Sequence, residues 1–247
     1  MVIPTYNEVG NIEKITEEVL KQPAFVDILI VDDNSPDGTG DIADTLAASP
    51  GTAGRVHVLH RPGKEGLGRA YLAGFVWALD SGYDAMVEMD ADLSHDPLYL
   101  KSIVDAAGAA DVVIGSRYLN GISVINWPLS RILLSWGANK YVRTVTGLLV
   151  NDCTSGYRLY HRRVLEALDL PNVRSNGYSF QVEMTFRAQL CGFRIVEVPI
   201  IFMERRAGQS KLSKGVVWES LLMPLRLRWH ARAMKRGMGK VEQVGAA

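Results

Sequence analysis

Runs of apolar, strand-like residues alternate with helix-like patterns through the first half of the chain, and this alternation constrains the fold more than any other feature. Residues 26–31 form a run rich in β-branched side chains, and they follow a segment in which Ile12, Ile15 and Val19 recur at helical spacing. A buried strand that follows an amphipathic helix indicates a β-α-β unit, whose strands run parallel. We therefore predict an α/β protein with a mostly parallel central sheet.

The same alternation continues along the chain. Further strands are predicted at residues 56–59, 85–89 and 111–114, and helices at 40–48 and 67–79. After residue 120 we expect a longer helix at about 128–146 and short strands near 156–160 and 194–199, as an elaboration of one domain. The opening residues 1–4 are short for a full central strand, so we expect either a clipped strand or a late start. A length of 247 residues fits a single domain with a substantial core.

Charge, cysteines and hydropathy exclude several classes of protein. Lys and Arg total 27, as do Asp and Glu, so no overall field favours nucleic acid. Cys153 and Cys191 lack metal-ligand spacing, and we expect two buried thiols in a reducing compartment. No apolar run reaches the roughly 18 to 20 residues that span a bilayer, and no signal peptide precedes the fold. These features predict a cytosolic or peripheral protein.

Two pairs of carboxylates follow predicted strands, at the edge where parallel sheets bind ligands. Asp32 and Asp33 come directly after residues 26–31 and can accept hydrogen bonds from a base or a ribose, although a solvated turn with helix-capping acids fits equally well. Asp90 and Asp92 end the strand at 85–89 and can face one hard divalent cation, which would neutralise a diphosphate. A polar strand end is the alternative for this second pair.

Glycines and basic residues provide candidate anion sites. Residues 66–70, Gly-Leu-Gly-Arg-Ala, lie at a strand-to-helix crossover where a helix N-terminus favours phosphate, and Arg69 fits a surface position equally well. Arg117 follows the strand at 111–114. Arg131 and Ser135 lie one turn apart on the next helix, where they can converge with Arg117 on an anion or simply face solvent.

A compact basic loop with a glycine covers residues 205–211 and is of a kind that folds over bound phosphates. With this loop, six motifs occur in an order typical of one family. They are Pro4-Thr5-Tyr6-Asn7-Glu8, Asp32-Asp33 with Ser35 and Asp37-Gly38-Thr39, Gly66-Leu67-Gly68, Asp90-Ala91-Asp92-Leu93-Ser94-His95, Gly115-Ser116-Arg117-Tyr118, and Arg205 with Gly208, Ser210 and Lys211. Together they resemble the dolichol-phosphate (polyprenol monophospho-) mannose synthases, which are family 2 glycosyltransferases of GT-A fold.

The resemblance extends from residue 2 to about residue 215 and implies transfer of mannose from GDP-mannose to a polyprenyl phosphate, with inversion and with Mg²⁺ or Mn²⁺. By motif position it implies that Asp90, Asp92 and Arg117 are catalytic. The implied donor-binding residues are Pro4, Tyr6, Glu8, Val31, Asp33, Asp90, Ala91, Asp92, Arg117, Arg205 and Lys211. The implied acceptor-phosphate residues are Arg117, Arg131 and Ser135, and the implied metal ligands are Asp90, Asp92 and Ser94. Some relatives carry Gln where this chain has Ser94.

The implied reaction needs no general base in the protein. A phosphate monoester is already anionic near pH 7 because its second pKa lies around 6. The tasks that remain are to hold two anions in line and to stabilise the departing diphosphate, which a metal ion and basic side chains can do.

The end of the chain differs in charge from the rest. From Lys211 to Ala247 there are eight Lys or Arg residues against two Glu. We expect a catalytic domain at residues 1–212 and an amphipathic basic helix and tail at 213–247. Such a helix either lies on anionic lipid at the cytoplasmic face of a membrane, with or without a separate membrane-anchoring subunit, or packs on the domain.

Other functions fit parts of the sequence. A transferase of the same fold that uses a UDP-sugar, such as a polyprenyl-phosphate glucose synthase, differs only in its donor socket. A non-catalytic nucleotide-binding module is a further alternative, but such a module need not retain Asp90, Asp92, Arg117 and Lys211 together. No aromatic-basic platform accompanies the basic tail, so nucleic acid is not an expected partner.

Overall fold

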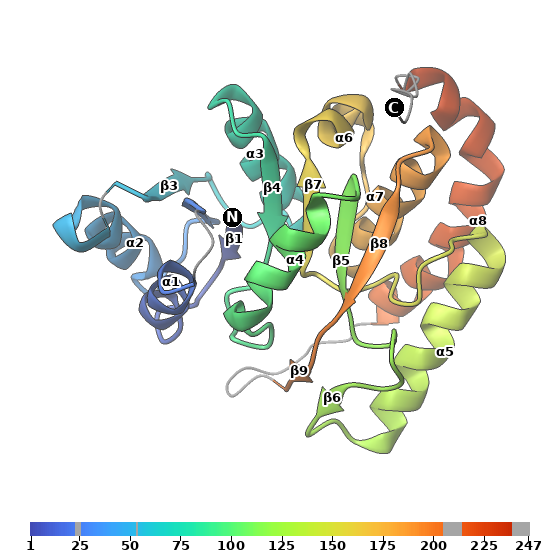
Figure 1. The fold of residues 1–247 in the computed structure, drawn as a ribbon, viewed down its shortest axis with the longest axis horizontal. Helices are drawn as coiled ribbons and strands as arrows, with labels where there is room; N and C mark the ends of the chain where they lie inside the picture. Colours follow the sequence, from blue (N-terminus) through green and yellow to red (C-terminus); the bar gives the residue numbers. More distant parts are fainter. Residues whose placement is uncertain (23–25, 53, 205–213, 239–247) are drawn as a thin grey trace.

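A seven-stranded sheet organises the molecule, which the computed structural model describes over residues 1–22, 26–52, 54–204 and 214–238 (Figure 1). The strand order is β3-β2-β1-β4-β7-β5-β8, and β7 alone runs antiparallel to its neighbours β4 and β5. The strands of this sheet are β1 (Val2–Thr5), β2 (Ile28–Asp32), β3 (Val56–His60), β4 (Ala85–Glu88), β5 (Val112–Ser116), β7 (Arg158–His161) and β8 (Ile195–Pro199). The prediction of a mostly parallel sheet is confirmed.

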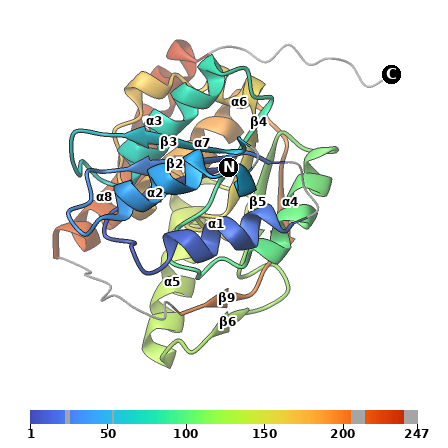
Figure 2. The same cartoon turned by 90° about the vertical axis from the view of Figure 1, so that its left-hand side faces the viewer.

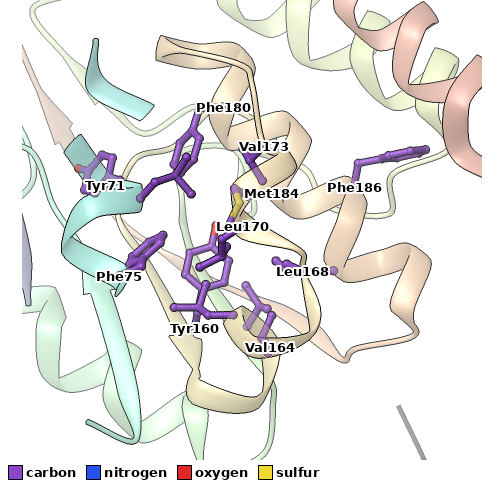
Figure 3. Packing of buried hydrophobic residues seen from close by; sticks show 14 of the residues in the cluster. Tyr71, Phe75, Tyr160, Val164, Leu168, Leu170, Val173, Phe180, Met184 and Phe186 are labelled. Atoms are coloured by element: carbon purple, nitrogen blue, oxygen red, sulfur yellow. The ribbon is translucent and has the colours of Figure 1, made fainter. Parts of the chain in front are cut away.

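Helices cover both faces of this sheet. They are α1 (Ile12–Leu20), α2 (Thr39–Ala48), α3 (Leu67–Asp80), α4 (Leu100–Ala107), α5 (Leu129–Thr146), α6 (Arg162–Ala167), α7 (Gly177–Cys191) and α8 (Lys214–Gly237). Short 3₁₀ turns lie at Pro50–Thr52, Pro97–Tyr99 and Leu170–Asn172. One hydrophobic core joins the sheet to α1, α2 and α4, and a second joins it to α3, α6, α7 and α8. In the second core, aromatic side chains from α3, β7 and α7 pack together (Figure 3).

The opening of the chain forms a central strand despite its shortness. β1 pairs with β2 over four residues, and Val2 lies opposite Glu88 of β4. All four residues of β1 are buried, as are all five of β2. Because both faces are covered, these strands read as continuous apolar runs in the sequence.

Two features were not predicted. The short strand expected near residues 156–160 is β7, which lies inside the main sheet between β4 and β5 and is not a peripheral elaboration. Helix α7 is buried around most of its circumference, from Ser179 to Ala188, so it lacks the apolar stripe that marks a helix in sequence.

A small second sheet lies beside the start of α5 (Figures 1 and 2). It consists of β6 (Val124–Ile125) and β9 (Phe202–Met203), which pair in parallel. A further bridge joins Phe202 to His95, which follows β4. The segment after β8 is therefore tied both to the β4 loop and to the approach to α5.

Helix α8 packs on the rest of the molecule through α5 and α7. Met223 and Leu227 are buried there, and the Tyr141 hydroxyl of α5 donates to the carbonyl of Leu221 at 2.6 Å. In the described part of the chain, no helix combines the length and the apolar character needed to cross a membrane. Both cysteines are free thiols; Cys153 is buried as expected, whereas Cys191 is only partly buried.

Candidate active site

The carboxyl ends of β1, β2, β4 and β5 meet at one edge of the sheet, and the predicted site residues lie in the loops that follow them. Tyr6 follows β1, Asp33 follows β2, Asp90 follows β4 and Arg117 follows β5. Because β7 is antiparallel, its beginning lies at this same edge, which adds the loop at residues 151–157 to the site. This loop was not among the predicted site residues.

The predicted nucleoside socket contains a buried ion pair. Arg61 Nη1 donates to Asp33 Oδ1 at 2.5 Å, and Arg61 Nη2 donates to Glu65 at 2.6 Å. Burial raises the pKa of Asp33, and Arg61 offsets only part of that effect. Sequence reasoning missed Arg61, although its position directly after β3, at the binding edge, was a signal that could have found it.

The neighbouring Asp32 serves the local turn. Its carboxylate accepts from the hydroxyls of Thr5, at 3.1 Å, and Ser35, at 2.5 Å, and from the backbone N–H of Ser35 at 3.1 Å. These bonds fasten the end of β1 to the loop after β2. Of the two adjacent acids, Asp32 therefore holds the turn, and Asp33 remains the candidate for a ligand.

The remaining predicted donor-binding residues on β1 and β2 lie along the same wall. Pro4 and Val31 are buried neighbours in the sheet ladder. The ring of Tyr6 lies 4.0 Å from Lys64 Nζ, a cation-π contact. The backbone N–H of Glu8 donates to Thr39 Oγ1 at 3.0 Å, and its carboxylate accepts from Asn11 at 2.8 Å. The loops after β1 and β2 are thus bonded to each other.

The predicted metal pair lies just beyond β4. Asp92 and Ala91 are buried, whereas the Asp90 side chain is 23% exposed. Ser94 donates to Asp92 Oδ1 through its hydroxyl, at 2.5 Å, and through its backbone N–H, at 3.0 Å. Leu93 between them has a φ of 60°, a conformation that a branched side chain rarely adopts and that persists only where the surroundings impose it. The Ser94 hydroxyl thus orients Asp92.

Two further groups border Asp90. The Tyr71 hydroxyl donates to Asp90 Oδ1 at 3.0 Å, and His95 Nδ1 lies 3.9 Å from Asp90 Oδ2. Burial lowers the pKa of His95, although Asp90 and Asp92 oppose that shift, so the imidazole is neutral near pH 7. A β-carbon on Gly156 would lie 3.5 Å from Asp90 Oδ2 and 3.6 Å from Oδ1, so the glycine leaves room beside the carboxylate.

Arg117 is held by a buried carboxylate. Its Nε and Nη2 each donate to Asp152 at 2.7 Å, its backbone N–H donates to the same carboxylate at 3.0 Å, and Nη2 also reaches Thr154. Burial raises the pKa of Asp152, but the charge and hydrogen bonds of Arg117 outweigh it and leave the pKa below its ordinary value. If Arg117 contacts a phosphate, it does so with a guanidinium whose orientation is already fixed by Asp152.

The loop that carries Asp152 is itself anchored on three sides. Glu197 of β8 accepts from the backbone N–H groups of Asn151, at 2.8 Å, and Asp152, at 2.9 Å. Asn139 of α5 accepts from the backbone of Cys153 at 2.7 Å. The buried Arg158 donates to two carbonyls of the same loop. Asp152 is thus positioned by β7, β8 and α5 together.

The predicted acceptor residues Arg131 and Ser135 both have partners on this side of the molecule. Arg131 Nη1 donates to Glu204 at 2.6 Å, and its guanidinium lies 4.0 Å from the centre of the Trp127 ring. Ser135 accepts from the Tyr118 hydroxyl at 2.7 Å. Trp127 was missed in sequence, where a single tryptophan before a helix gives no distinctive signal. Arg205 and Lys211 lie outside the described residues.

A row of rings connects the carboxylate pair with Arg131. His95, beside Asp90, packs edge to face on Phe202 at 5.0 Å between ring centres. Phe202 packs in the same way on Trp127 at 5.4 Å, and Trp127 lies under Arg131. The two predicted subsites are therefore linked by one continuous row of packed rings.

The donor set at Asp90 and Asp92 fits a hard divalent cation that is also bound by a substrate. Among the described residues, no three His, Cys, Asp or Glu side chains gather as they would around a fully protein-bound metal. Mg²⁺ is commonly held by one or two carboxylates, with water and substrate phosphates completing its shell. Two carboxylates at a ligand-binding edge, with room beside Asp90, meet that requirement.

The chain belongs to a family of glycosyltransferases, because the model described as Glycosyl transferase family 2 matches residues 1–169. It is 48% identical over 241 residues to an undecaprenyl-phosphate mannosyltransferase of Micrococcus luteus, and the alignment covers 96% of this chain and 98% of the relative. It is 52% identical over 223 residues to a polyprenol monophosphomannose synthase of Mycolicibacterium smegmatis, and the alignment covers 90% of this chain and 83% of the relative. The protein is thus a glycosyltransferase, and the predicted family is confirmed.

Solved structures show the same fold. A glucosyl-3-phosphoglycerate synthase of Mycobacterium tuberculosis, crystallised with Mn²⁺, uridine diphosphate and phosphoglyceric acid, matches with a TM-score of 0.63. The match covers 99% of this chain and 80% of that one, at 18% identity. At that identity the likeness establishes the fold, and the GT-A prediction is confirmed.

Proposed function

We propose that this glycosyltransferase transfers mannose from GDP-mannose to a polyprenyl phosphate, with inversion at the anomeric carbon and with Mg²⁺ or Mn²⁺ bound at Asp90 and Asp92. The observation that carries the proposal is the row of rings from His95 to Trp127, because it connects the carboxylate pair with Arg131. The names of the relatives from Micrococcus luteus and Mycolicibacterium smegmatis support mannose and a polyprenyl phosphate.

The residues of the chain divide the work of this reaction. A bound divalent cation would supply positive charge to the diphosphate as it departs. Asp33 and Tyr6 lie where a nucleoside would contact the loops after β1 and β2. Arg131 and Ser135 would hold the acceptor phosphate, which is already anionic and needs no general base. The division into a catalytic part at residues 1–212 and a helix and tail at 213–247 belongs to this proposal.

A lipid acceptor requires a membrane surface, and the outer sides of α5 and α8 offer a matching one, which we call the α5–α8 face. On α5, Leu129, Leu133 and Trp136 are exposed one turn apart, and Lys140 lies 5.1 Å from the Trp136 ring. The exposed apolar residues of α8 are Leu221, Leu222, Leu225 and Trp229.

The charges around the α5–α8 face favour anionic lipid. The exposed basic residues of α8 are Arg226, Arg228, Arg232, Lys235 and Arg236, and no Asp or Glu occurs between residues 221 and 236. Each basic residue near an anionic surface contributes about 1 kcal/mol. We propose that this face lies on the cytoplasmic surface of a membrane, where the polyprenyl chain can stay in the lipid while its phosphate reaches Arg131.

Transfer with purified components tests the function. The full chain is incubated with labelled GDP-mannose, a short polyprenyl phosphate, and Mg²⁺, Mn²⁺ or EDTA, and organic-soluble label is counted. We expect product with either metal and none with EDTA. A parallel assay with labelled UDP-glucose distinguishes the alternative donor, and the unphosphorylated polyprenol is the acceptor control. Absence of organic-soluble product from GDP-mannose with both metals would refute the proposal.

A further inference from the structure

A hydrogen bond joins Tyr71 in the core to Asp90 at the ligand-binding edge. Tyr71 lies on α3, is fully buried, and donates from its hydroxyl to Asp90 Oδ1 at 3.0 Å. Its ring belongs to the second core, and the buried Glu88 is a further titratable group of the interior that acts on it. The hydroxyl of a core residue thus bonds to one of the two carboxylates at the ligand-binding edge.

The ring of Tyr71 packs against two phenylalanine rings. It stacks on Phe180 of α7, with ring centres 6.0 Å apart and planes within 6°, and it lies 6.2 Å from Phe75 (Figure 3). Both phenylalanines are fully buried. Because protein cores are close-packed, a ring held in this way has little freedom to move its hydroxyl.

The glycine motif before α3 sets the position of this ring. A β-carbon on Gly68 would lie 2.7 Å from the carbonyl oxygen of Ser175 and 3.0 Å from the Phe180 ring. Only a glycine lets the first turn of α3 approach α7 this closely. The Gly66-Leu67-Gly68 motif, whose sequence predicts a phosphate-binding turn, thus has a packing role that brings Tyr71 against Phe180.

From this arrangement we infer that Tyr71 is a positioning residue, which fixes the Asp90 carboxylate in the orientation that receives a divalent cation. The inference rests on the proposed metal site. The hydroxyl bonds Oδ1 and so limits the rotation of a carboxylate that lies at a partly exposed edge, with both of its oxygens beside Gly156. Hydrogen bonds to metal-ligating groups typically change metal affinity by about 10- to 100-fold.

Metal affinity of the full-length chain tests the inference directly. Free Mn²⁺ is measured by electron paramagnetic resonance during titration of wild-type protein and Tyr71→Phe, each with GDP present. The substitution removes one oxygen and keeps the stacked ring. We expect the Kd for Mn²⁺ to rise about 10-fold or more in the variant. In the transfer assay, the variant should need more Mn²⁺ than wild type but reach the same kcat once Mn²⁺ is saturating.

A matched control comes from a tyrosine far from this edge. The Tyr83 hydroxyl donates to Asp27 at 2.7 Å, so Tyr83→Phe also removes one tyrosine-to-aspartate hydrogen bond. We expect its Kd for Mn²⁺ to stay within twofold of wild type. Equal Mn²⁺ affinity of Tyr71→Phe and wild type would overturn the inference, as would an equal loss in Tyr83→Phe.

A second variant tests the Tyr71–Asp90 hydrogen bond by changing the packing of α3 and not the tyrosine itself. Gly68→Ala keeps the tyrosine but forces α3 away from α7, so it too should weaken Mn²⁺ binding at a temperature where its melting curve shows it folded. If wild-type protein transfers mannose and binds Mn²⁺ while both α3 variants bind it equally well, the positioning role fails and the proposed function stands. If wild-type protein binds no Mn²⁺ in the presence of GDP, the metal site and the inference fail together.

Discussion

The ligand-binding edge of the sheet and the α5–α8 face show opposite relations between polarity and burial. At the edge, charged groups are buried and paired, as in the bidentate bonds between Arg117 and Asp152 and in the Arg61–Asp33 pair. On the α5–α8 face, large apolar side chains are exposed, up to 86% for Trp229, with basic residues around them. Ordinary soluble surfaces seldom bury charged groups, and they expose large apolar residues mostly one at a time.

The difference indicates two kinds of partner. Buried, paired charges keep a fixed geometry and suit a small polar ligand whose phosphates need aligned groups. Exposed apolar residues with a basic border suit a fluid surface, which does not require fixed geometry. Substitutions in each region therefore test this contrast.

The largest effect is expected at the edge. Asp92→Ala should lower mannose transfer by on the order of a thousandfold or more, because the divalent cation that it would hold supplies several kcal/mol of charge stabilisation. Its melting temperature should stay close to that of wild type. Asp105→Ala, an exposed residue of α4 that pairs only with Lys101 in the described chain, is the control. Near-normal transfer by purified Asp92→Ala would remove Asp92 from the mechanism.

The next effect is on stability. Asp152→Asn should lower the free energy of unfolding by about 3–5 kcal/mol, because it leaves the buried Arg117 guanidinium without its counter-charge. Urea denaturation at pH 7 measures this loss. An unchanged free energy of unfolding would show that the pair contributes no net stability.

The pH dependence of the same pair has a definite sign. The folded-state pKa of Asp152 lies below its ordinary value, so the stabilisation is fully present above the unfolded-state pKa. It is lost as the pH falls through the folded-state pKa. The difference in stability between wild type and Asp152→Asn should therefore narrow below about pH 4.

A smaller effect is expected on membrane binding. Leu133→Glu and Trp229→Glu should each weaken binding to anionic vesicles by roughly tenfold or more, since burial of one such side chain contributes about 1.5–3 kcal/mol. Vesicle flotation measures the bound fraction. Leu98→Glu alters a similarly exposed leucine in the turn Pro97–Tyr99, off the α5–α8 face, and should leave binding unchanged. If all three variants float like wild type, the face does not bind lipid.

The smallest effect concerns the border between the two regions. Glu204→Gln should lower the KM for polyprenyl phosphate by up to about fivefold, because it frees Arg131 from an ion pair that contributes up to roughly 1 kcal/mol. Steady-state kinetics with varied acceptor measure it. Glu166→Gln, which breaks the comparable exposed pair with Arg162, is the control and should not change KM. A higher KM in Glu204→Gln would show instead that Glu204 positions Arg131.

Much of the fold could be predicted because it follows from local periodicity. The helix at α1 and the strands β2, β3 and β4 were found where apolar spacing was clear. Helix α7 was missed because its burial on most sides removes periodicity, and the place of β7 was missed because strand order is a property of the whole chain.

Site residues could be predicted where a local sequence motif carries the chemistry. They could not be predicted where a side chain bonds to a residue that is distant in the sequence. Asp90, Asp92 and Arg117 stand in recognisable motifs directly after strands. Asp152, which lies 35 positions after Arg117, has no local signal, because its role arises only when β7 brings its loop to the same edge. The direct metal role of Ser94 stays a prediction, alongside its observed bond to Asp92.

The place of β7 has a consequence for how the molecule assembles. In the sheet, β7 lies between β4 and β5 and is the strand that joins them. In the chain, β7 follows β5 by about forty residues. During synthesis the first four strands can pair as they emerge, whereas β5 has no partner among them and must wait for β7 and β8. Pairing of β7 with β5 also brings Asp152 to Arg117. A nascent chain therefore cannot form this buried ion pair before the segment up to β7 has joined the sheet.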